Sequence, residues 1–445
     1  MTEILIVGGG YAGLYTALHL EKSTRRRHVH VTLVDPRPYM TYQPFLPEVV
    51  SGAVEPRHTL VSLRRHLRTT TLVPATVTDI DHAHRTVRAR ALDGRALRFD
   101  YDIIVVTAGA VTRTFAIPGL AEHAIGLKNV EEAVAIRDRL LTAFERAAVL
   151  PDGPERARLL TVTFVGGGFS GVEGFGEALS LATEQLRYYP EIRQEELEFH
   201  LIEARDRILP EVTDKPGRWV VERLRTRGAH VHLNTQLVSA VGGHVVLSTG
   251  EAFDSDLIVW TAGNAANGVV ANHTDLPVDD RGYLVTRPDL RIGTDDAIVA
   301  DAWAAGDNAA IPDLAVGNDT LTVPNAQHAV RQARLLAANI AAVLDGDEPR
   351  NYTHAGLGVV ATLGRGDGLF QYKRLVIRGW PAWAMHRGYH VLAVPTWERK
   401  VRVLLGWFGA FVGRRDIVSP ATTVTPFDAP AGTTPLDVHV DTKVA

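Results

Sequence analysis

Short apolar runs alternate with segments of helical periodicity along the first 350 residues. The run EILIV at 3–7 predicts a buried parallel strand, residues 12–22 predict a helix, and VHVTLV at 29–34 predicts a second strand that ends before Asp35. Strand, helix and strand in this order form a βαβ unit. Further strands are predicted at 72–80, 85–92, 97–99 and 101–110, with a turn at Asp93–Gly94.

The same order of elements returns later in the chain. A helical stretch at 130–149 and a break rich in proline and glycine lead into an apolar strand that ends in VGGG at 165–168. Each half runs from a strand through three glycines into a helix, then to a strand ending in an acid, a small sheet and a strand ending in Thr-Ala-Gly. This pattern indicates an internal duplication at the level of the fold. The remaining predicted elements are strands at 196–203, 229–247 and 256–263 and a helix at 324–344.

Composition narrows the classes of function. A chain of 445 residues with 46% hydrophobic residues predicts two or three globular domains, and a net charge of −4 carries no sign of nucleic-acid binding. The chain has no cysteine, which excludes disulfides, redox dithiols, cysteine nucleophiles and thiolate metal sites, and we predict no metal site. No signal peptide and no apolar window of about 18 residues is found, so we expect a cytoplasmic chain without a transmembrane helix.

Gly8-x-Gly10-x-x-Gly13 lies between a predicted strand and a predicted helix, and Asp35 ends the next strand. In such a loop the first glycine makes the tight turn, the second lets a pyrophosphate approach the helix N-terminus, and the third lets the helix pack on the strand. The acid can accept hydrogen bonds from a ribose diol. The motif therefore predicts dinucleotide binding.

Gly166-x-Gly168-x-x-Gly171 has the same context, with Glu203 as the acid. An acid at this position favours NAD over NADP, although the nearby Arg205 leaves NADPH open. Two such motifs predict an α/β chain with two nested Rossmann-like domains. One holds a resident flavin dinucleotide and the other an exchangeable nicotinamide.

Six ordered motifs carry a family resemblance. VGGGYAG, TYQPFLPEV, VVTAGA, VGGGFSGVEGFGE, WAAGDNA and PNAQHAVRQ, over about residues 3–415, closely resemble the motifs of the type II NADH:quinone oxidoreductases. These are single-subunit, FAD-containing NADH dehydrogenases of the two-dinucleotide-binding-domain flavoprotein superfamily. The resemblance implies a glutathione-reductase-like fold with FAD and NAD(H) as cofactors.

The resemblance also implies two sets of binding residues. The FAD set is Gly8, Gly10, Tyr11, Ala12, Gly13, Asp35, Pro36, Gln43, Pro44, Val77, Ala108, Gly109, Gly306, Asp307, Ala326 and Gln327. The NAD set is Gly166, Gly168, Phe169, Ser170, Gly171, Glu203, Ala262 and Gly263. Two of these assignments have structural alternatives: the loop at 43–45 can be only a rigid buried turn, and Asp307 can be only a helix N-cap.

Glu173 follows the second glycine loop closely. In the first turn of a helix, the dipole stabilises a carboxylate, so its role can be electrostatic alone. The resemblance implies instead a catalytic position where nicotinamide, flavin and quinone meet, and quinone reduction consumes protons that a titratable group can supply. Glu177, one turn further on, is expected to pack or cap.

The resemblance also points to Gln327 and His328 as catalytic residues at the start of a helix opposite the flavin. The quinone is expected to contact Gln327, Arg331 and Lys373. The family pattern has a second glutamine four residues after the first, whereas here position 331 is arginine and the glutamine is at 332. Arg331 can bond a quinone carbonyl or face solvent, and His328 can be a packed histidine.

Residues 397–412 carry an amphipathic stripe of apolar side chains. Cations flank the stripe, and four of the seven tryptophans fall within 380–407. This pattern is typical of a helix lying in the headgroup region of an anionic membrane, with an ordinary core helix or a dimer interface as alternatives. The stripe consists of Val401, Leu404, Leu405, Phe408, Phe411 and Val412, and the flanking cations are Arg399, Lys400, Arg402, Arg414 and Arg415.

Together these features predict an NADH dehydrogenase that passes a hydride from NADH to FAD and two electrons to a membrane quinone. Peripheral contact through about residues 380–415 on the inner face of the cell membrane is expected, and a homodimer is possible from the sequence. A soluble reductase of the ferredoxin, rubredoxin or diaphorase type and a redox-sensing flavoprotein are the alternatives. The predicted domains are FAD-binding (1–120 and 266–350), NAD(H)-binding (121–265), quinone- and membrane-facing (351–415) and a disordered tail (416–445).

Overall fold

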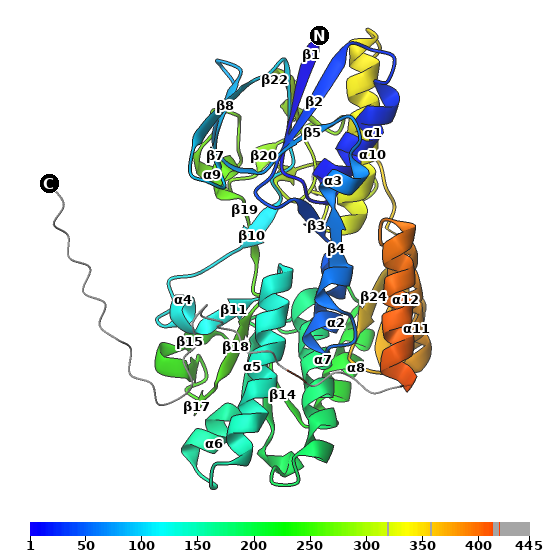
Figure 1. Ribbon diagram of the computed structural model, residues 1–445. Helices are drawn as coiled ribbons and strands as arrows, with labels where there is room; N and C mark the ends of the chain where they lie inside the picture. Colours follow the sequence, from blue (N-terminus) through cyan, green and yellow to red (C-terminus); the bar gives the residue numbers. More distant parts are fainter. Residues whose placement is uncertain (318–319, 357, 413–417, 419–445) are drawn as a thin grey trace, which may run out of the picture.

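The structure, a computed structural model, describes residues 1–317, 320–356, 358–412 and 418 (Figure 1). Two parallel sheets occupy its two ends, and helices α11 (Trp380–Ala393) and α12 (Trp397–Val412) lie together along one flank. The tail predicted at 416–445 lies, except for Val418, outside the described residues, as do Arg414, Arg415 and the side chains of Phe411 and Val412. The α/β class with two sheets of the Rossmann type, predicted from the two glycine motifs, is confirmed.

The first sheet has both faces covered. Ile4 and Ile6 of its central strand pack beneath helices α1 (Tyr11–Ser23) and α10 (Ala326–Leu344), while Leu5 and Val7 pack on the opposite side against a small antiparallel sheet. Since neither face meets water, this strand is a continuous apolar run and does not alternate. The strand order is β21 (Arg291–Gly293), β22 (Ile298–Ala304), β9 (Ile103–Val106), β1 (Thr2–Val7), β2 (Val29–Val34) and β5 (Thr71–Val73), parallel except for β21 with β22. The covering elements are α1 (Tyr11–Ser23), α10 (Ala326–Leu344), β6 (Ala75–Asp81), β7 (Thr86–Ala91) and β8 (Ala96–Asp100).

Two predicted strands are each divided in the structure. The strand expected at 72–80 is interrupted at Pro74, which has no N–H for the ladder, so that β5 joins the large sheet and β6 the small one. The strand expected at 101–110 ends at Val106, and Gly109, with a φ of +68°, turns the chain into β10 (Ala110–Thr112).

The second sheet repeats the plan with five parallel strands. Helices α5 (Val130–Ala148) and α7 (Phe169–Gln185) bury Phe144 and Phe175 on one face, and Val165 and Trp260 pack on the other face against an antiparallel sheet. The strand order is β11 (Ala124–Gly126), β18 (Leu257–Trp260), β12 (Thr161–Val165), β13 (Glu198–Ile202) and β14 (Ala229–His232). Around it lie α5 (Val130–Ala148), α7 (Phe169–Gln185), α8 (Asp214–Arg225), β15 (Leu237–Ser239), β16 (His244–Leu247) and β17 (Ala252–Asp254).

Three connections position the site between the sheets. Strand β10, which leads from the first sheet to the second, pairs antiparallel with β19 (Asn264–Ala266), which leads back, so the two connections form one joint. Helix α2 (Leu46–Val50) packs its apolar residues into the core formed by α5 and α7. The C-terminal hairpins β24 (Val359–Thr362), β25 (Gly368–Tyr372) and β26 (Leu375–Arg378) carry α11 and meet α7, where the backbone of Leu363 leaves no room for a Cβ at Gly176.

The remaining short elements are β3 (Tyr39–Thr41), η1 (Gln43–Phe45), η2 (Pro56–Thr59), β4 (Leu60–Ser62), α3 (Leu63–His66), α4 (Leu120–His123), α6 (Pro154–Leu159), η3 (Leu186–Tyr188), η4 (Gln194–Glu196), η5 (Val241–Gly243), α9 (Gly268–Asn272), β20 (Leu284–Val285) and β23 (Ala309–Ala310).

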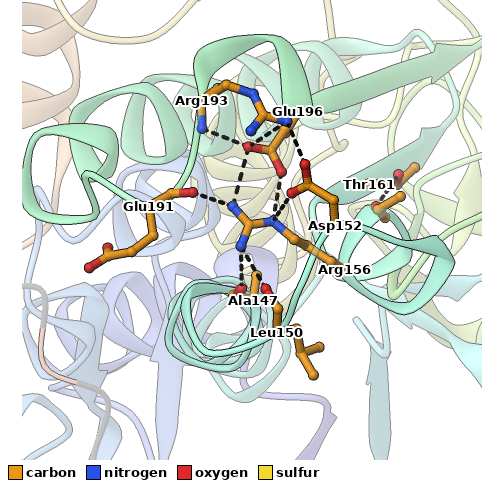
Figure 2. Close-up of polar contacts among 9 residues, drawn as sticks. Ala147, Leu150, Asp152, Arg156, Thr161, Glu191, Arg193 and Glu196 are labelled. Carbon is orange, nitrogen blue, oxygen red and sulfur yellow. Dashed lines mark hydrogen bonds and ion pairs between the residues drawn. The ribbon is translucent and has the colours of Figure 1, made fainter.

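One buried guanidinium fastens the far end of the second sheet (Figure 2). Arg156 on α6 is 5% exposed and donates to the carbonyl oxygens of Ala147 and Leu150, both at 2.9 Å, where α5 ends. Its Nε donates to Glu196 at 2.6 Å, and Glu196 also accepts from the backbone N–H of Arg193 at 2.8 Å. Arg156 therefore reinforces the end of α5, where the Ala147 carbonyl also accepts the Leu150 N–H at 3.2 Å.

We expect Arg156→Gln to lower the free energy of unfolding by on the order of 2–3 kcal/mol, because the shorter amide cannot reach both the α5 carbonyls and Glu196. Urea denaturation monitored by circular dichroism measures this effect. Arg95→Gln is the control, since Arg95 pairs with Asp93 on an exposed turn. Equal stability of the two variants would contradict the assigned role.

Candidate active site

A single cavity of about 1720 Å³ runs between the two sheets. Its lining includes Gly10 at the start of α1 and Gly168 at the start of α7. Pockets for single small ligands usually measure about 300–1,000 Å³, so this cavity has room for more than one ligand. Both predicted dinucleotide loops therefore open into the same space.

The first glycine turn has the geometry that the motif predicts. Gly8 has a φ of +99°, and a Cβ on Gly13 would lie 1.8 Å from the Gly8 carbonyl oxygen, so helix and strand approach too closely for any side chain. Asp35 accepts the Gly9 N–H at 2.6 Å, and Thr107 donates to the Gly8 carbonyl at 2.9 Å. Asp35 thus holds the turn, a role that the sequence did not reveal and that adds to its predicted role in binding a ribose.

The second turn matches the first contact by contact. Gly166 has a φ of +114°, and a Cβ on Gly171 would lie 1.9 Å from the Gly166 carbonyl oxygen. Glu203 accepts the Gly167 N–H at 2.6 Å, and Thr261 donates to the Gly166 carbonyl at 3.2 Å. The predicted duplication therefore extends to the hydrogen bonds of each loop.

Two observations at these turns fit dinucleotide phosphates. A Cβ on Gly10 or on Gly168 would meet nothing within 4 Å, so open space faces each helix start. Neither α1 nor α7 has a side-chain cap or an acidic residue in its first turn. A helix start with free space and no competing carboxylate suits an anionic group.

Most of the residues predicted to bind cofactor or substrate line this one cavity, and four of them lie outside its lining. Gly13 lies behind the wall as the packing glycine, Pro36 is exposed beyond β2, and Val77 lies on the small sheet. Lys373 is exposed on the turn between β25 and β26 with its Nζ over the Tyr372 ring, so the structure does not bring it to the expected quinone site. The lining residues are Gly8, Gly10, Tyr11, Ala12, Asp35, Gln43, Pro44, Ala108, Gly109, Gly166, Gly168, Phe169, Ser170, Gly171, Glu173, Glu203, Ala262, Gly263, Gly306, Asp307, Ala326, Gln327, His328 and Arg331.

Asp307 lies in the turn after β22 and precedes β23, so it does not cap a helix and that alternative is wrong. Burial raises the pKa of its carboxyl, which Lys128 partly offsets. Lys128 also lines the cavity, and its Nζ donates to the Asn264 side chain at 2.7 Å. Lysine at this position was not identified from the sequence, because no motif surrounds it.

Of the polar residues at the start of α10, some line the cavity and one is buried in the core. Gln327 and Arg331 line the cavity, and Arg331 donates to the Gln327 carbonyl at 2.9 Å. Gln332 is buried and accepts the Gly306 N–H at 2.9 Å, so it supports the turn beside Asp307 and does not face the cavity. His328 pairs with the Tyr352 hydroxyl at 2.8 Å and also borders the cavity.

Glu173 is buried, 7% exposed, and belongs to the second turn of α7, not the first. Desolvation raises the pKa of its carboxyl to about 8, and the Thr362 N–H, which donates to Oε1 at 3.1 Å, opposes this rise. A helix-end dipole would lower the pKa. The expected position in the first turn is therefore wrong, and the direction of the Glu173 pKa follows burial, not a helix-end dipole.

A buried histidine that the sequence analysis missed contacts this carboxyl. His386 Nε2 lies 3.1 Å from Glu173 Oε1, and His386 Nδ1 lies 4.0 Å from Glu48 Oε1. Burial lowers the pKa of His386 to about 3, which favours a neutral imidazole beside Glu173. The sequence signal that could have identified His386 is its i, i+4 spacing with His390 on α11, within the tryptophan-rich segment. The contact with Glu48 and Glu173 was not visible, because it joins three distant elements.

Comparison with known proteins agrees with this geometry. Residues 2–333 match the family described as pyridine nucleotide-disulphide oxidoreductases. A type II NADH:quinone oxidoreductase of Mycobacterium tuberculosis is 28% identical and is matched over 93% of this chain and 89% of its own length. One from Haemophilus influenzae is also 28% identical, over 82% of this chain and 85% of its own length.

A solved structure extends the likeness to the fold. NDH2 from Plasmodium falciparum, in complex with NADH, superposes with a TM-score of 0.86 at 18% identity, covering 94% of this chain and all of its own. The resemblance inferred from the six motifs is thereby confirmed.

Proposed function

The chain belongs to the pyridine nucleotide-disulphide oxidoreductase family, and from this premise we propose that it is an FAD-dependent NADH:quinone oxidoreductase. The observation that carries the proposal is the one cavity onto which both glycine turns open. The relatives at 28% identity favour a quinone over the ferredoxin-type or diaphorase alternatives as the acceptor. FAD, when bound, accepts the hydride of NADH and passes two electrons on to the quinone.

The residues of the chain divide the work of binding. The turn at Gly8–Gly13, with Asp35, would hold the FAD pyrophosphate and ribose, and Asp307 lies where it can bond the rest of the cofactor. The turn at 166–171, with Glu203, would hold NADH. Arg331 and Gln327 offer donors to a quinone at the start of α10.

Glu173 can supply a proton during quinone reduction. Its carboxyl is protonated at pH 7, since burial raises its pKa to about 8, and it lines the cavity. His386 Nε2 lies 3.1 Å from this carboxyl, and burial lowers the pKa of His386 to about 3, so the histidine stays beside the acid as a neutral group. A general acid with a pKa near the working pH is well suited to this transfer.

Anaerobic stopped-flow spectrophotometry tests the function. We expect NADH to bleach the flavin absorbance and a menaquinone analogue to restore it within a turnover time. Reoxidation by iron–sulfur proteins alone would show that the acceptor is not a quinone.

We further propose that the enzyme binds peripherally to the inner face of the cell membrane and forms a homodimer. No helix within the described ranges is both long and apolar enough to cross a bilayer. Helix α12 turns Val403 and Trp407 inward, the latter donating to Glu48 at 2.7 Å. Leu405 and Phe408 are 64% and 67% exposed on the same helix, which supports an interfacial helix over an ordinary core helix. The other large apolar side chains exposed on α11, α12 and the segment between them are Trp380, Met385, Tyr389, Leu392, Trp397 and Leu404.

Replacing Leu405 and Phe408 together by asparagine should weaken binding to phosphatidylglycerol vesicles by roughly 10²–10⁴-fold. Each apolar side chain contributes roughly 1.5–3 kcal/mol when it leaves water for the bilayer. Vesicle co-sedimentation measures the change. Leu92→Asn is the control, because Leu92 is 73% exposed on the distant small sheet. Unchanged sedimentation of the double variant would exclude α12 as the membrane contact.

A further inference from the structure

A cluster of histidines and carboxylates lies on the second sheet, outside the cavity. His200 on β13 and His232 on β14 come from neighbouring parallel strands, and Glu251 comes from the turn before β17. One ligand atom from each of these three side chains lies within 4.8 Å of those from the other two, and Glu251 Oε2 lies 3.6 Å from His232 Nδ1. None of the three lines the cavity, so the cluster is separate from the active site.

From this geometry we propose that His200, His232 and Glu251 form a binding site for a divalent transition metal ion, with Zn²⁺ as the fitting probe. His200 Nδ1 lies 3.1 Å from His232 Nε2. Two nitrogens bound to Zn²⁺ at about 2.0–2.1 Å in a tetrahedral arrangement are about 3.3 Å apart, so only a small movement of the rings is needed. A carboxylate as third ligand leaves a fourth position for water.

The surroundings hold the first histidine in the required orientation. The Phe253 ring stacks on His200 at 3.9 Å between centroids, and Glu198 Oε2 lies 3.7 Å from His200 Nε2. At 3.7 Å the carboxylate is too far for a direct hydrogen bond, but its charge favours a proton on the outer nitrogen and so leaves the inner nitrogen free to bind a metal. Glu198 also lies 2.7 Å from His230 Nε2, which fixes its own position.

The proposed site touches the strand end that carries Glu203. The backbone carbonyl of His232 accepts the Glu203 N–H at 2.8 Å, and the Thr235 N–H donates to the Glu203 carbonyl at 3.0 Å. A metal ion at His232 would thus also fasten the segment that positions the acid of the second glycine motif.

Isothermal titration of Zn²⁺ into the full-length, FAD-loaded protein after chelator treatment tests the proposal. We expect one tight equivalent in the wild type and its loss in His232→Gln. Glu198→Gln should weaken binding about 10- to 100-fold through His200. His244→Ala is the control, since His244 pairs with Asp254 on the exposed edge of the same domain and lies outside the cluster.

Thermal melts in chelator establish whether the variants fold. Should His232→Gln fail to fold, Glu251→Gln replaces it, because the Glu251 side chain is exposed. Absence of a tight equivalent in the wild type would overturn the proposal. The same holds if both His232→Gln and Glu251→Gln bind Zn²⁺ as tightly as the wild type, which would place the ion elsewhere.

Discussion

Glu173→Gln is expected to slow steady-state quinone reduction by roughly 10²–10⁴-fold, the range by which a general acid accelerates a reaction. The amide keeps the shape of the side chain and can still accept the Thr362 N–H, but it cannot donate a proton to the quinone. FAD content and the rate of flavin bleaching by NADH should stay near wild type, because hydride transfer needs no acid. Stopped-flow measurement of the two half-reactions separates these effects.

The pH dependence should change as well. Turnover of the wild type should fall as the pH rises through about 8, where Glu173 loses its proton, and the variant should lack this limb. Glu177→Gln is the matched control for turnover at pH 7, and because the Glu177 charge helps to raise the pKa of Glu173, this variant should keep the limb and shift it to lower pH. Glu177 is buried one turn further along α7 with its Oε1 accepting from Thr362, yet it does not line the cavity. Wild-type quinone turnover in Glu173→Gln would remove Glu173 from the mechanism.

Stability provides an independent measurement on the same variant. Because the folded-state pKa of Glu173 is raised from 4.5 to about 8, the native chain keeps a proton that the unfolded chain loses. The contribution of Glu173 to the free energy of unfolding is therefore fully present below about pH 4.5, and it declines by several kcal/mol as the pH rises towards 8. The melting temperature of Glu173→Gln should fall less between pH 5 and pH 9 than that of the wild type.

Gly168→Ala and Gly171→Ala should separate binding from folding in the second glycine turn. A Cβ at Gly168 meets no protein atom within 4 Å, so the melting temperature should be unchanged, while the methyl group enters the space where the NADH pyrophosphate belongs. We expect the KM for NADH to rise at least about tenfold, as for the loss of a hydrogen bond to a charged group.

A Cβ at Gly171 would lie 1.9 Å from the Gly166 carbonyl, so α7 must move and the melting temperature should fall together with NADH affinity. Gly10→Ala in the first turn is the control, because it should empty the FAD site and leave the NADH turn intact. If Gly168→Ala binds NADH as tightly as the wild type, the nicotinamide nucleotide does not use this loop.

Local patterns in the sequence predicted the two turns, because each is determined by residues close together in the chain. The three glycines and the acid of each loop suffice to define the turn, and the structure adds only the bonds from Thr107 and Thr261. Strand lengths were less predictable where a single Pro74 or Gly109 redirects the chain.

The wall behind Glu173 could not be predicted in the same way. His386, Glu48 and Trp407 come from α11, α2 and α12, and only packing in three dimensions brings them together. Burial itself changes the chemistry of Glu173, and burial is not a property of a motif. Conversely, a family pattern alone placed Lys373 at the quinone site, whereas its hairpin turn carries it to the surface.

The joint of β10 and β19 has a consequence for synthesis of the protein. Strand β9 receives its neighbour β22 only after the whole second sheet, within residues 124–260, has been made. Domains generally fold as units as they emerge from the ribosome. Here synthesis of the first sheet begins before that of the second sheet, but the first sheet is completed only after the second. We expect the five-stranded second sheet to fold in the nascent chain first. Until β22 has been synthesised, the first sheet is incomplete and β9 is exposed at its edge. Flavin retention by ribosome-bound chains should therefore begin only once residue 304 and the helix beyond it have left the exit tunnel.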